Sequence, residues 1–486
     1  MPGIEPQEFL FLLPEMFLAA VGMTLLVAGS IGKGVNHRAI EGWSLAGLGL
    51  TAVLVFWIKG QAISGQLLLA EMFIHDNYAI FWKILFLVAT ALTVFLSARF
   101  VEEGRYRPSE YYSLLLLATT GMMLMVSGFT LLSIWISLEL MALSSYILAG
   151  YFKREKKSNE AALKYFILGA LSSGILLYGI SLLYGATGTI QLAELAARLP
   201  GAQAANGMLV TLGWIFLAAG LLFKVAAVPF HVWTPDVYVG APTPVTAYLA
   251  AASKAASFAI LVRIFYMGLT PLVLDWQLLV ASVAVLSMVW GNLAALTQQN
   301  VKRMLAYSSI AHAGYILIGV LAVNEIGLWA LMFYLLAYTL MTLGAFGTVI
   351  LLERREYAGE TYADYAGLAQ RAPLLAALML IFLLGLTGIP PTGGFFGKFY
   401  LFAAAVESGW TWVAVIGVIM SAISLYYYMG VVVYMYFQDS ERTTPVPLRA
   451  PVLVGAIGFC ALVTVLLGIL PGPFVELAKA SLLPLP

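Results

Sequence analysis

The chain has 486 residues, of which 62% are hydrophobic and only 10% are charged, with a formal net charge of +1. Soluble globular proteins carry about 25% charged residues, so the composition excludes a water-soluble domain and indicates an all-α polytopic membrane protein. The balanced charge argues against nucleic acid as a partner. The single cysteine excludes an intrachain disulfide and a multi-cysteine metal or iron–sulfur site, and the four histidines lack metal-ligand spacing.

Apolar runs that can cross a bilayer, which takes about 20 residues, follow one another along the chain. About fourteen spans are predicted, at residues 8–29, 41–58, 78–99, 111–128, 130–150, 161–186, 207–228, 243–267, 271–297, 303–323, 325–352, 373–409, 411–437 and 451–471. Two spans are interrupted, at "VPFHVWTP" (228–235) and at "GIPPTGG" (388–394). Paired interrupted helices in the two halves of a chain indicate a transport site.

Loop lysines and arginines are distributed unevenly between the two sides of the membrane. When the loops are assigned alternately, the side of the N-terminus holds only Lys59, Arg198, Arg263 and Lys479, and the other side holds most of the basic residues. Basic loops remain in the cytoplasm. We therefore expect both termini on the outer side, which is the periplasm if the protein is bacterial.

Five lysines fall within the predicted spans: Lys83, Lys164, Lys224, Lys254 and Lys398. Lys83 lies near a span end and is expected to snorkel to the surface, whereas the other four are expected to lie deep. A charge at mid-membrane costs about 2.5–3.5 kcal/mol. Because burial disfavours the charged form of a lysine and a nearby carboxylate favours it, buried lysines can act as reversible proton carriers, which arginine cannot.

Acidic residues are almost absent from the spans. Glu15 follows Pro14 near a helix end, and Glu139 lies within "SIWISLELMALSSYILAG" (133–150). Glu139 is either a structural ion-pair partner of a buried lysine or a carboxylate at a proton site.

Two histidines leave similar alternatives open. His231 lies in the first break and either relays a proton or satisfies a helix end by hydrogen bonding; His312 is a relay or a satisfied polar residue between helices.

The two halves of the chain are expected to be inverted repeats of five helices, each with a discontinuous helix. "YILAG" (146–150) recurs as "YILIG" (315–319), and a lysine accompanies each break. Five spans separate the counterparts, and an odd number inverts the second repeat in the membrane. The predicted divisions are 1–110 (three helices), 111–268 (first repeat), 269–438 (second repeat) and 439–486 (last helix).

Three long motifs resemble the antiporter-like membrane subunits of respiratory complex I, NADH:quinone oxidoreductase. They are "FKVAAVPFHVWTPDVYVGAPTPVTAYLAAASK" (223–254), "VKRMLAYSSIAHAGYILIG" (301–319) and "GIPPTGGFFGKFYLF" (388–402). The resemblance covers essentially the whole chain and is greatest to the bacterial subunit N, or subunit-2, type. The subunit N type is similar to this chain because it also carries a lysine at the position of Lys398, whereas the subunit M type typically carries glutamate there.

This resemblance implies roles for the charged residues in proton translocation. Glu139 would pair with Lys224 of the first broken helix, and Lys164 would bridge this pair towards the interior. Lys254 would be the connecting lysine, and Lys398 would lie near the outlet to the outer side.

The resemblance also implies that His231 and His312 lie on a central hydrophilic axis, and that Val239 replaces a residue that is often polar in the family. It implies an enzyme subunit without a cofactor or metal of its own, with NADH, FMN, iron–sulfur clusters and quinone in partner subunits. The expected partners are a neighbouring antiporter-like subunit, small subunits of the K and J types and the lipid of a bacterial inner membrane.

Three alternatives remain at this point. A subunit of an Mrp-type sodium/proton antiporter would share the fold but exchange sodium without NADH oxidation. A ferredoxin-linked dehydrogenase or a hydrogenase would use another electron donor. A structural membrane scaffold would tolerate the loss of Glu139 or Lys224.

Overall fold

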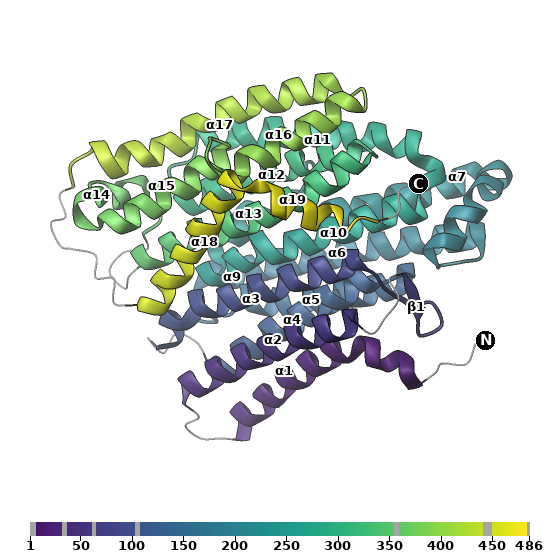
Figure 1. The fold of residues 1–486 in the computed structure, drawn as a ribbon, viewed down its shortest axis with the longest axis horizontal. Helices are drawn as coiled ribbons and strands as arrows, with labels where there is room; N and C mark the ends of the chain where they lie inside the picture. Colours follow the sequence, from purple (N-terminus) through teal and green to yellow (C-terminus); the bar gives the residue numbers. More distant parts are fainter. Residues whose placement is uncertain are drawn as a thin grey trace.

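The computed structural model describes residues 6–31, 36–60, 65–102, 107–353, 359–440 and 450–483. These residues form an almost entirely helical bundle (Figure 1). The helices of the first half are η1 (Pro6–Leu12), α1 (Leu13–Ile31), α2 (His37–Lys59), α3 (Asn77–Glu102), α4 (Pro108–Ser127), α5 (Leu131–Ala149), α6 (Lys156–Thr187), α7 (Leu192–Lys224), α8 (Trp233–Gly240), α9 (Thr243–Tyr248) and α10 (Lys254–Arg263). Those of the second half are α11 (Val273–Leu296), α12 (Val301–Leu321), α13 (Glu325–Leu352), α14 (Leu368–Arg371), α15 (Pro373–Thr387), α16 (Gly393–Glu407), α17 (Thr411–Phe437), α18 (Pro451–Ile469) and α19 (Pro471–Lys479).

Twelve helices of the described residues are long and apolar enough to cross a membrane. The prediction of about fourteen spans also counts α4, whose first turns carry Glu110 and two tyrosines, and the broken pair α15 and α16. The all-helical, multi-pass fold is therefore confirmed.

Both predicted interruptions are present. The first separates α7, which ends at Lys224, from α8, which begins at Trp233; the second separates α15, which ends at Thr387, from α16, which begins at Gly393. The structure adds two π-helical turns, Leu249–Ser253 and Ile264–Gly268, on either side of α10. Such turns often occur at functional sites, and the apolar pattern of the sequence gave no sign of them.

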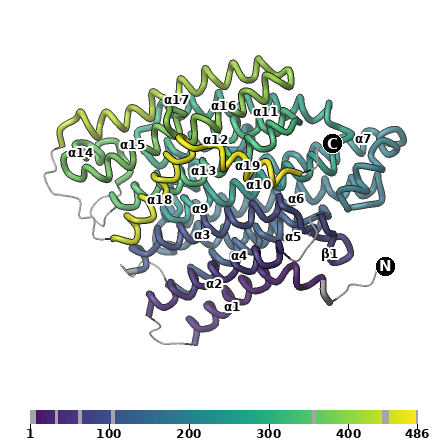
Figure 2. Tube along the Cα trace, viewed as in Figure 1, coloured from purple at the N-terminus to yellow at the C-terminus, as the bar shows by residue number. Residues whose placement is uncertain are grey.

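The chain passes from one edge of the bundle to the other (Figure 2). Helices α1 and α2 form one edge and α17 the opposite edge, with α10, α12 and α13 between them. The helices in the middle are buried on all sides, whereas α1, α2 and α17 expose most of their apolar side chains. The C-terminal α18 returns to pack against α3 and α13.

Two bridges tie loops together at opposite ends of the bundle. Thr130 pairs with Gln191, and Asn300 pairs with Thr361; each residue of the second pair follows its counterpart by 170 positions. Thr130 caps α5 and Asn300 caps α12, with their side chains accepting from backbone N–H groups. This correspondence supports the predicted repeat, with α12 as the counterpart of α5.

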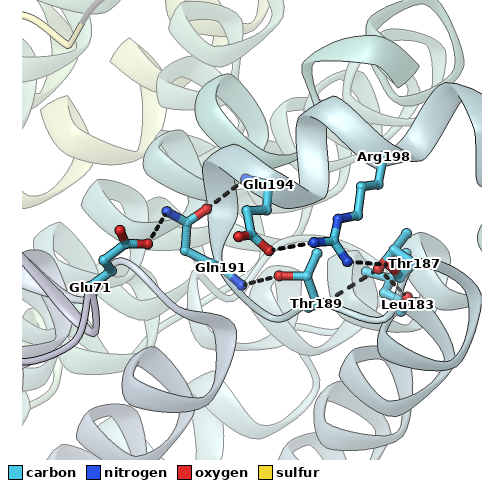
Figure 3. A network of polar contacts seen from close by, with 7 residues as sticks. All are labelled: Glu71, Leu183, Thr187, Thr189, Gln191, Glu194 and Arg198. Carbon is cyan, nitrogen blue, oxygen red and sulfur yellow. Dashed lines mark hydrogen bonds and ion pairs between the residues drawn. The ribbon is translucent and has the colours of Figure 1, made fainter. Parts of the chain in front are cut away.

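A short hairpin and a polar network hold the first bridge in place. Strands β1 (Gln66–Leu68) and β2 (Phe73–His75) are antiparallel, with Leu67 opposite Ile74. Figure 3 shows Gln191 donating to Glu71 at 3.1 Å and accepting from the backbone of Glu194. Arg198 joins Glu194 to the carbonyl of Thr187. The network therefore links the hairpin to the end of α6 and the start of α7.

Candidate functional site

Lys224 at the end of α7 faces two residues of α5. Its Nζ donates to the hydroxyl of Tyr146 at 3.2 Å and lies 5.6 Å from the centroid of the same ring. Glu139 precedes Tyr146 by seven residues, about two helical turns, so both side chains lie on one face of α5. Glu139 is within electrostatic range of both partners. Among the described residues, the hydrogen-bond partner of Lys224 is therefore Tyr146, and Glu139 acts on it through its charge.

Glu139 is held by the neighbouring helix α6. Ser173 donates a hydrogen bond to its Oε1, and the indole of Trp135 donates to the Ser173 hydroxyl at 3.0 Å. The carboxylate is half-buried at the contact between α5 and α6. A carboxylate with fixed donors and a nearby ammonium has a defined orientation, which a reversible proton site requires.

Lys164 is not buried inside the bundle, contrary to what was expected of a deep lysine. Its side chain is 40% exposed and pairs with Asp236 at 2.6 Å and Glu160 at 2.7 Å. Asp236 also binds Arg303 at 3.3 Å. Because α6 begins at Lys156, Lys164 lies only two turns inside the helix, among charged residues from α6, α8 and α12. The sequence could not show this, because α6 extends several residues before its apolar core.

Lys254 is buried directly after the first π-helical turn. Its Nζ donates to the carbonyl of Ser309 at 2.6 Å and to its hydroxyl at 2.5 Å. Ser309 lies 170 positions after Glu139, the same offset that relates the two bridges. The "YIL" motifs of the same two helices differ by 169 positions and place the adjacent Ser308 there, so in either register the second repeat has a serine where the first has a carboxylate, and Ser309 binds Lys254.

His312 is buried between two tyrosine hydroxyls. Its Nδ1 is 2.5 Å from Tyr334 Oη and its Nε2 is 3.1 Å from Tyr428 Oη. Tyr428 also bonds to Ser308. Both ring nitrogens therefore have partners that can donate or accept.

His231 has different surroundings. Its ring lies 6.2 Å from that of Trp290, and its Nδ1 is buried without a hydrogen-bond partner among the described residues. The structure thus places His312 in a polar network with potential proton donors and acceptors, and places His231 beside an aromatic ring.

Lys398 is seated on the carbonyls that the second break leaves free. Its Nζ donates to Leu386 O at 3.0 Å, Thr387 O at 2.8 Å and Ser421 Oγ at 2.9 Å. A helix end leaves its last carbonyls without partners, so the break supplies acceptors for the ammonium. The same Nζ lies 4.6 Å from the ring centroid of Tyr315.

Polar side chains between His312 and Lys398 escaped the sequence analysis. Asn292 is fully buried on α11; it donates to Tyr315 Oη at 3.1 Å and accepts from Tyr427 Oη at 3.0 Å. The rings of Tyr427 and Tyr428 are 4.5 Å apart. In an apolar run, a functional tyrosine cannot be told from a core tyrosine by its sequence. The one sign of a polar role was that several tyrosines lie within spans, where a hydroxyl needs a hydrogen-bond partner.

Two buried ion pairs lie outside this axis, and both correct the sequence analysis. Lys83 does not snorkel: it pairs with Glu15 at 2.6 Å, with both side chains buried. Arg263 is not in a loop: its side chain is 0% exposed and donates two hydrogen bonds to Asp76, of 2.8 and 2.9 Å. An arginine is therefore among the buried basic residues, and its fixed charge is balanced by a carboxylate at the start of α3.

Comparison with known proteins decides the family. The family model described as NADH:quinone oxidoreductase/Mrp antiporter, TM, matches residues 129–424. The chain is 44% identical to NADH-quinone oxidoreductase subunit N 2 of Rhizobium meliloti (strain 1021) over 468 residues, which cover 96% of each chain. The chain belongs to the subunit N family of NADH-quinone oxidoreductases.

Solved structures agree with this membership. A chain of respiratory complex I from Thermus thermophilus with bound aureothin is 34% identical, with a TM-score of 0.81, covering 96% of this chain and 100% of that one. A chain of the Mrp complex from Dietzia sp. DQ12-45-1b gives a TM-score of 0.82 at 23% identity, covering 98% of this chain and 97% of that one. At that identity the second match shows a shared fold alone, whereas subunit N family membership rests on the closer relatives.

Proposed function

We propose that this chain is a proton-translocating membrane subunit of an NADH-quinone oxidoreductase, and that Glu139, Lys224, Lys254 and Lys398 carry the translocation. The observation that carries the proposal is the seating of a buried lysine at each helix break, with a tyrosine ring beside it. Intramembrane ionisable residues mark ion pathways, and the arrangement occurs once in each half of the chain.

The proposed sequence of events begins at the first break. Redox chemistry in partner subunits perturbs the charge balance of Glu139 and Lys224, and Lys224 changes its protonation state. The proton then passes through Lys254 and Ser309 towards Lys398, from which it leaves on the outer side. Electron carriers and quinone belong to the partner subunits in this proposal.

His312 is proposed as the relay of the second half. A neutral imidazole accepts a proton at one nitrogen while it donates from the other. With Tyr428 at Nε2 and Tyr334 at Nδ1, His312 takes a proton on one side and releases one on the other. His231 and Lys164 are proposed only as residues near the entry, since Lys164 lies in a charged cluster at the end of the bundle.

The proposed setting is a bacterial cell membrane with both termini on the outer side, next to another antiporter-like subunit and small membrane subunits. Inverted membrane vesicles test the partner set directly. NADH should drive proton uptake that does not depend on sodium. Uptake that requires sodium, or a ferredoxin donor in place of NADH, would instead favour the antiporter or the ferredoxin-linked alternative.

A further inference from the structure

A cavity lined by both apolar and polar side chains opens beside α17 at the end of the bundle where α11 and α17 both end. Its volume is about 660 Å³. The polar residues of its lining are Gln298, Gln299, Tyr362, Tyr426, Tyr427 and Tyr434. Tyr427 lies ten residues before the end of α17, which corresponds to a depth of about 15 Å along the helix. A hydroxyl at this depth can bind water, which hydrocarbon chains cannot replace, and the amides of Gln298 and Gln299 can bind it at the mouth of the cavity, after the end of α11.

Tyr427 connects the cavity to the polar axis. Its ring is buried, its hydroxyl donates to Asn292 at 3.0 Å, and its ring lies 4.5 Å from that of Tyr428. Tyr428 in turn bonds to Nε2 of His312. A single pair of adjacent tyrosines therefore separates the cavity from the buried histidine.

A second cavity continues the first towards the second break. It has a volume of about 360 Å³ and reaches Lys398 and Ser421. Ala422 and Leu425 line both cavities. The two spaces thus adjoin along α17, from the end of the bundle to the buried lysine.

The two repeats differ at this position. In the first repeat, the span that contains α9 and α10 is completely buried, and α3 packs against it with Asp76 bound to Arg263. In the second repeat, α17 is the counterpart of that span and remains largely exposed. In the first repeat, α3 therefore covers the region that remains open in the second repeat.

We propose that the cavity beside Tyr427 is a water-filled inlet, through which protons from the side where α11 and α17 end enter the axis at Tyr428 and His312. This inference rests on the proposed function and deepens it. It gives the second half its own access to the side that the basic loops assign to the cytoplasm, in addition to the route through Lys224.

Cysteine accessibility tests the inlet in the assembled complex. The chain has one cysteine, Cys460, which is buried. Gly430→Cys places a thiol in the cavity, since a Cβ there meets only the Tyr362 ring at 3.5 Å. Gly458→Cys on α18 is the matched control, because its Cβ meets open space and it also lies seven residues from the same end of the bundle.

Inverted vesicles expose this end of the bundle to a charged, membrane-impermeant methanethiosulfonate reagent. We expect the reagent to modify Gly430→Cys and to lower NADH-driven proton uptake at least two-fold, while Gly458→Cys remains unmodified. Modification of both or neither overturns the proposal. If only a lipophilic maleimide modifies Gly430→Cys, lipid fills the cavity and the proposal is overturned. If the charged reagent modifies Gly430→Cys without a change in proton uptake, the cavity is not an inlet.

A substitution pair tests the connection to the axis. Tyr427→Phe removes the hydroxyl that binds Asn292, whereas Tyr436→Phe removes an exposed hydroxyl on the same helix that does not line the cavity. We expect Tyr427→Phe alone to lower the protons taken up per NADH, at least two-fold; equal uptake in the two variants contradicts the inlet. If Lys224→Ala does not lower proton uptake, that result counts against the proposed function. It does not change the result of the cysteine labelling, which tests the inlet.

Discussion

Lys224 donates a hydrogen bond to Tyr146 at the first helix break, and its ammonium lies 5.6 Å from the centre of the tyrosine ring. The ring contact, without the hydrogen bond, recurs at the second break, where Lys398 lies 4.6 Å from the ring centre of Tyr315. Lys224 lies just before the first break and Lys398 just after the second, and each tyrosine lies in the "YIL" motif of its half. A cation near an aromatic face is stabilised, so each ring favours the charged form of its lysine, against the cost of burial.

Tyr146→Phe should weaken proton translocation while keeping the ring in place. The hydroxyl accepts from a charged donor, and such hydrogen bonds contribute about 1.5–3 kcal/mol. We expect NADH-driven proton uptake to fall several-fold in vesicles that contain the assembled variant complex. Tyr165→Phe is the control, because Tyr165 is also buried and packs against the Tyr146 ring. Equal uptake in both variants would show that the hydroxyl of Tyr146 has no part in the process.

Glu139→Gln should abolish most proton uptake without preventing assembly. The amide can still accept from Ser173, so the contact between α5 and α6 is kept, but the charge that acts on Lys224 is lost. We expect at least a ten-fold fall in uptake, with the complex intact on a native gel. Glu194→Gln, an exposed carboxylate at the start of α7, should have no effect. Full activity of Glu139→Gln would make Glu139 a structural residue.

The sequence predicted the charged residues of the site better than their surroundings. Lys254 and Lys398 could be found because a charge in an apolar run is costly, and the breaks because prolines and glycines interrupt a span. Tyr427 and Asn292 could not be assigned, because a buried hydroxyl or amide is functional only through its partners. The pairing of Arg263 with Asp76 joins residues far apart in the chain, so only the folded structure reveals it.

Arg263→Met should destabilise the N-terminal half of the bundle. It leaves Asp76 buried without its partner, and breaking a buried ion pair costs about 3–5 kcal/mol. We expect a lower temperature for loss of the assembled complex, measured by native gel after heating in detergent. Arg107→Met removes an exposed ion pair with Glu110, which contributes about 0–1 kcal/mol, and serves as the control. Equal stability of the two variants would contradict the structural role of Arg263.

The hairpin should lose stability in mild acid because of His75. Burial, followed by the charge of Lys83, lowers the pKa of His75 from 6.5, with Asp76 and Glu15 opposing the shift. A histidine whose folded pKa is lowered contributes stability that is complete above about pH 6.5 and is lost as the pH falls through its unfolded pKa.

We therefore expect the complex to resist heat less well at pH 5.5 than at pH 7, and His75→Gln to reduce this difference. His37→Gln, at the start of α2 and the opposite end of the bundle, is the control. If His75→Gln leaves the pH dependence unchanged, another group causes it.

The measurement that tests the central claim most directly is proton uptake in inverted vesicles driven by NADH, comparing the wild type with Lys224→Ala. A native gel must first show that the variant complex assembles, and Lys479→Ala, an exposed lysine of α19, provides the matched control. The account predicts that proton uptake and NADH oxidation both collapse in Lys224→Ala and persist in Lys479→Ala. Normal uptake by an assembled Lys224→Ala complex would show that the buried lysine is structural and would contradict the account.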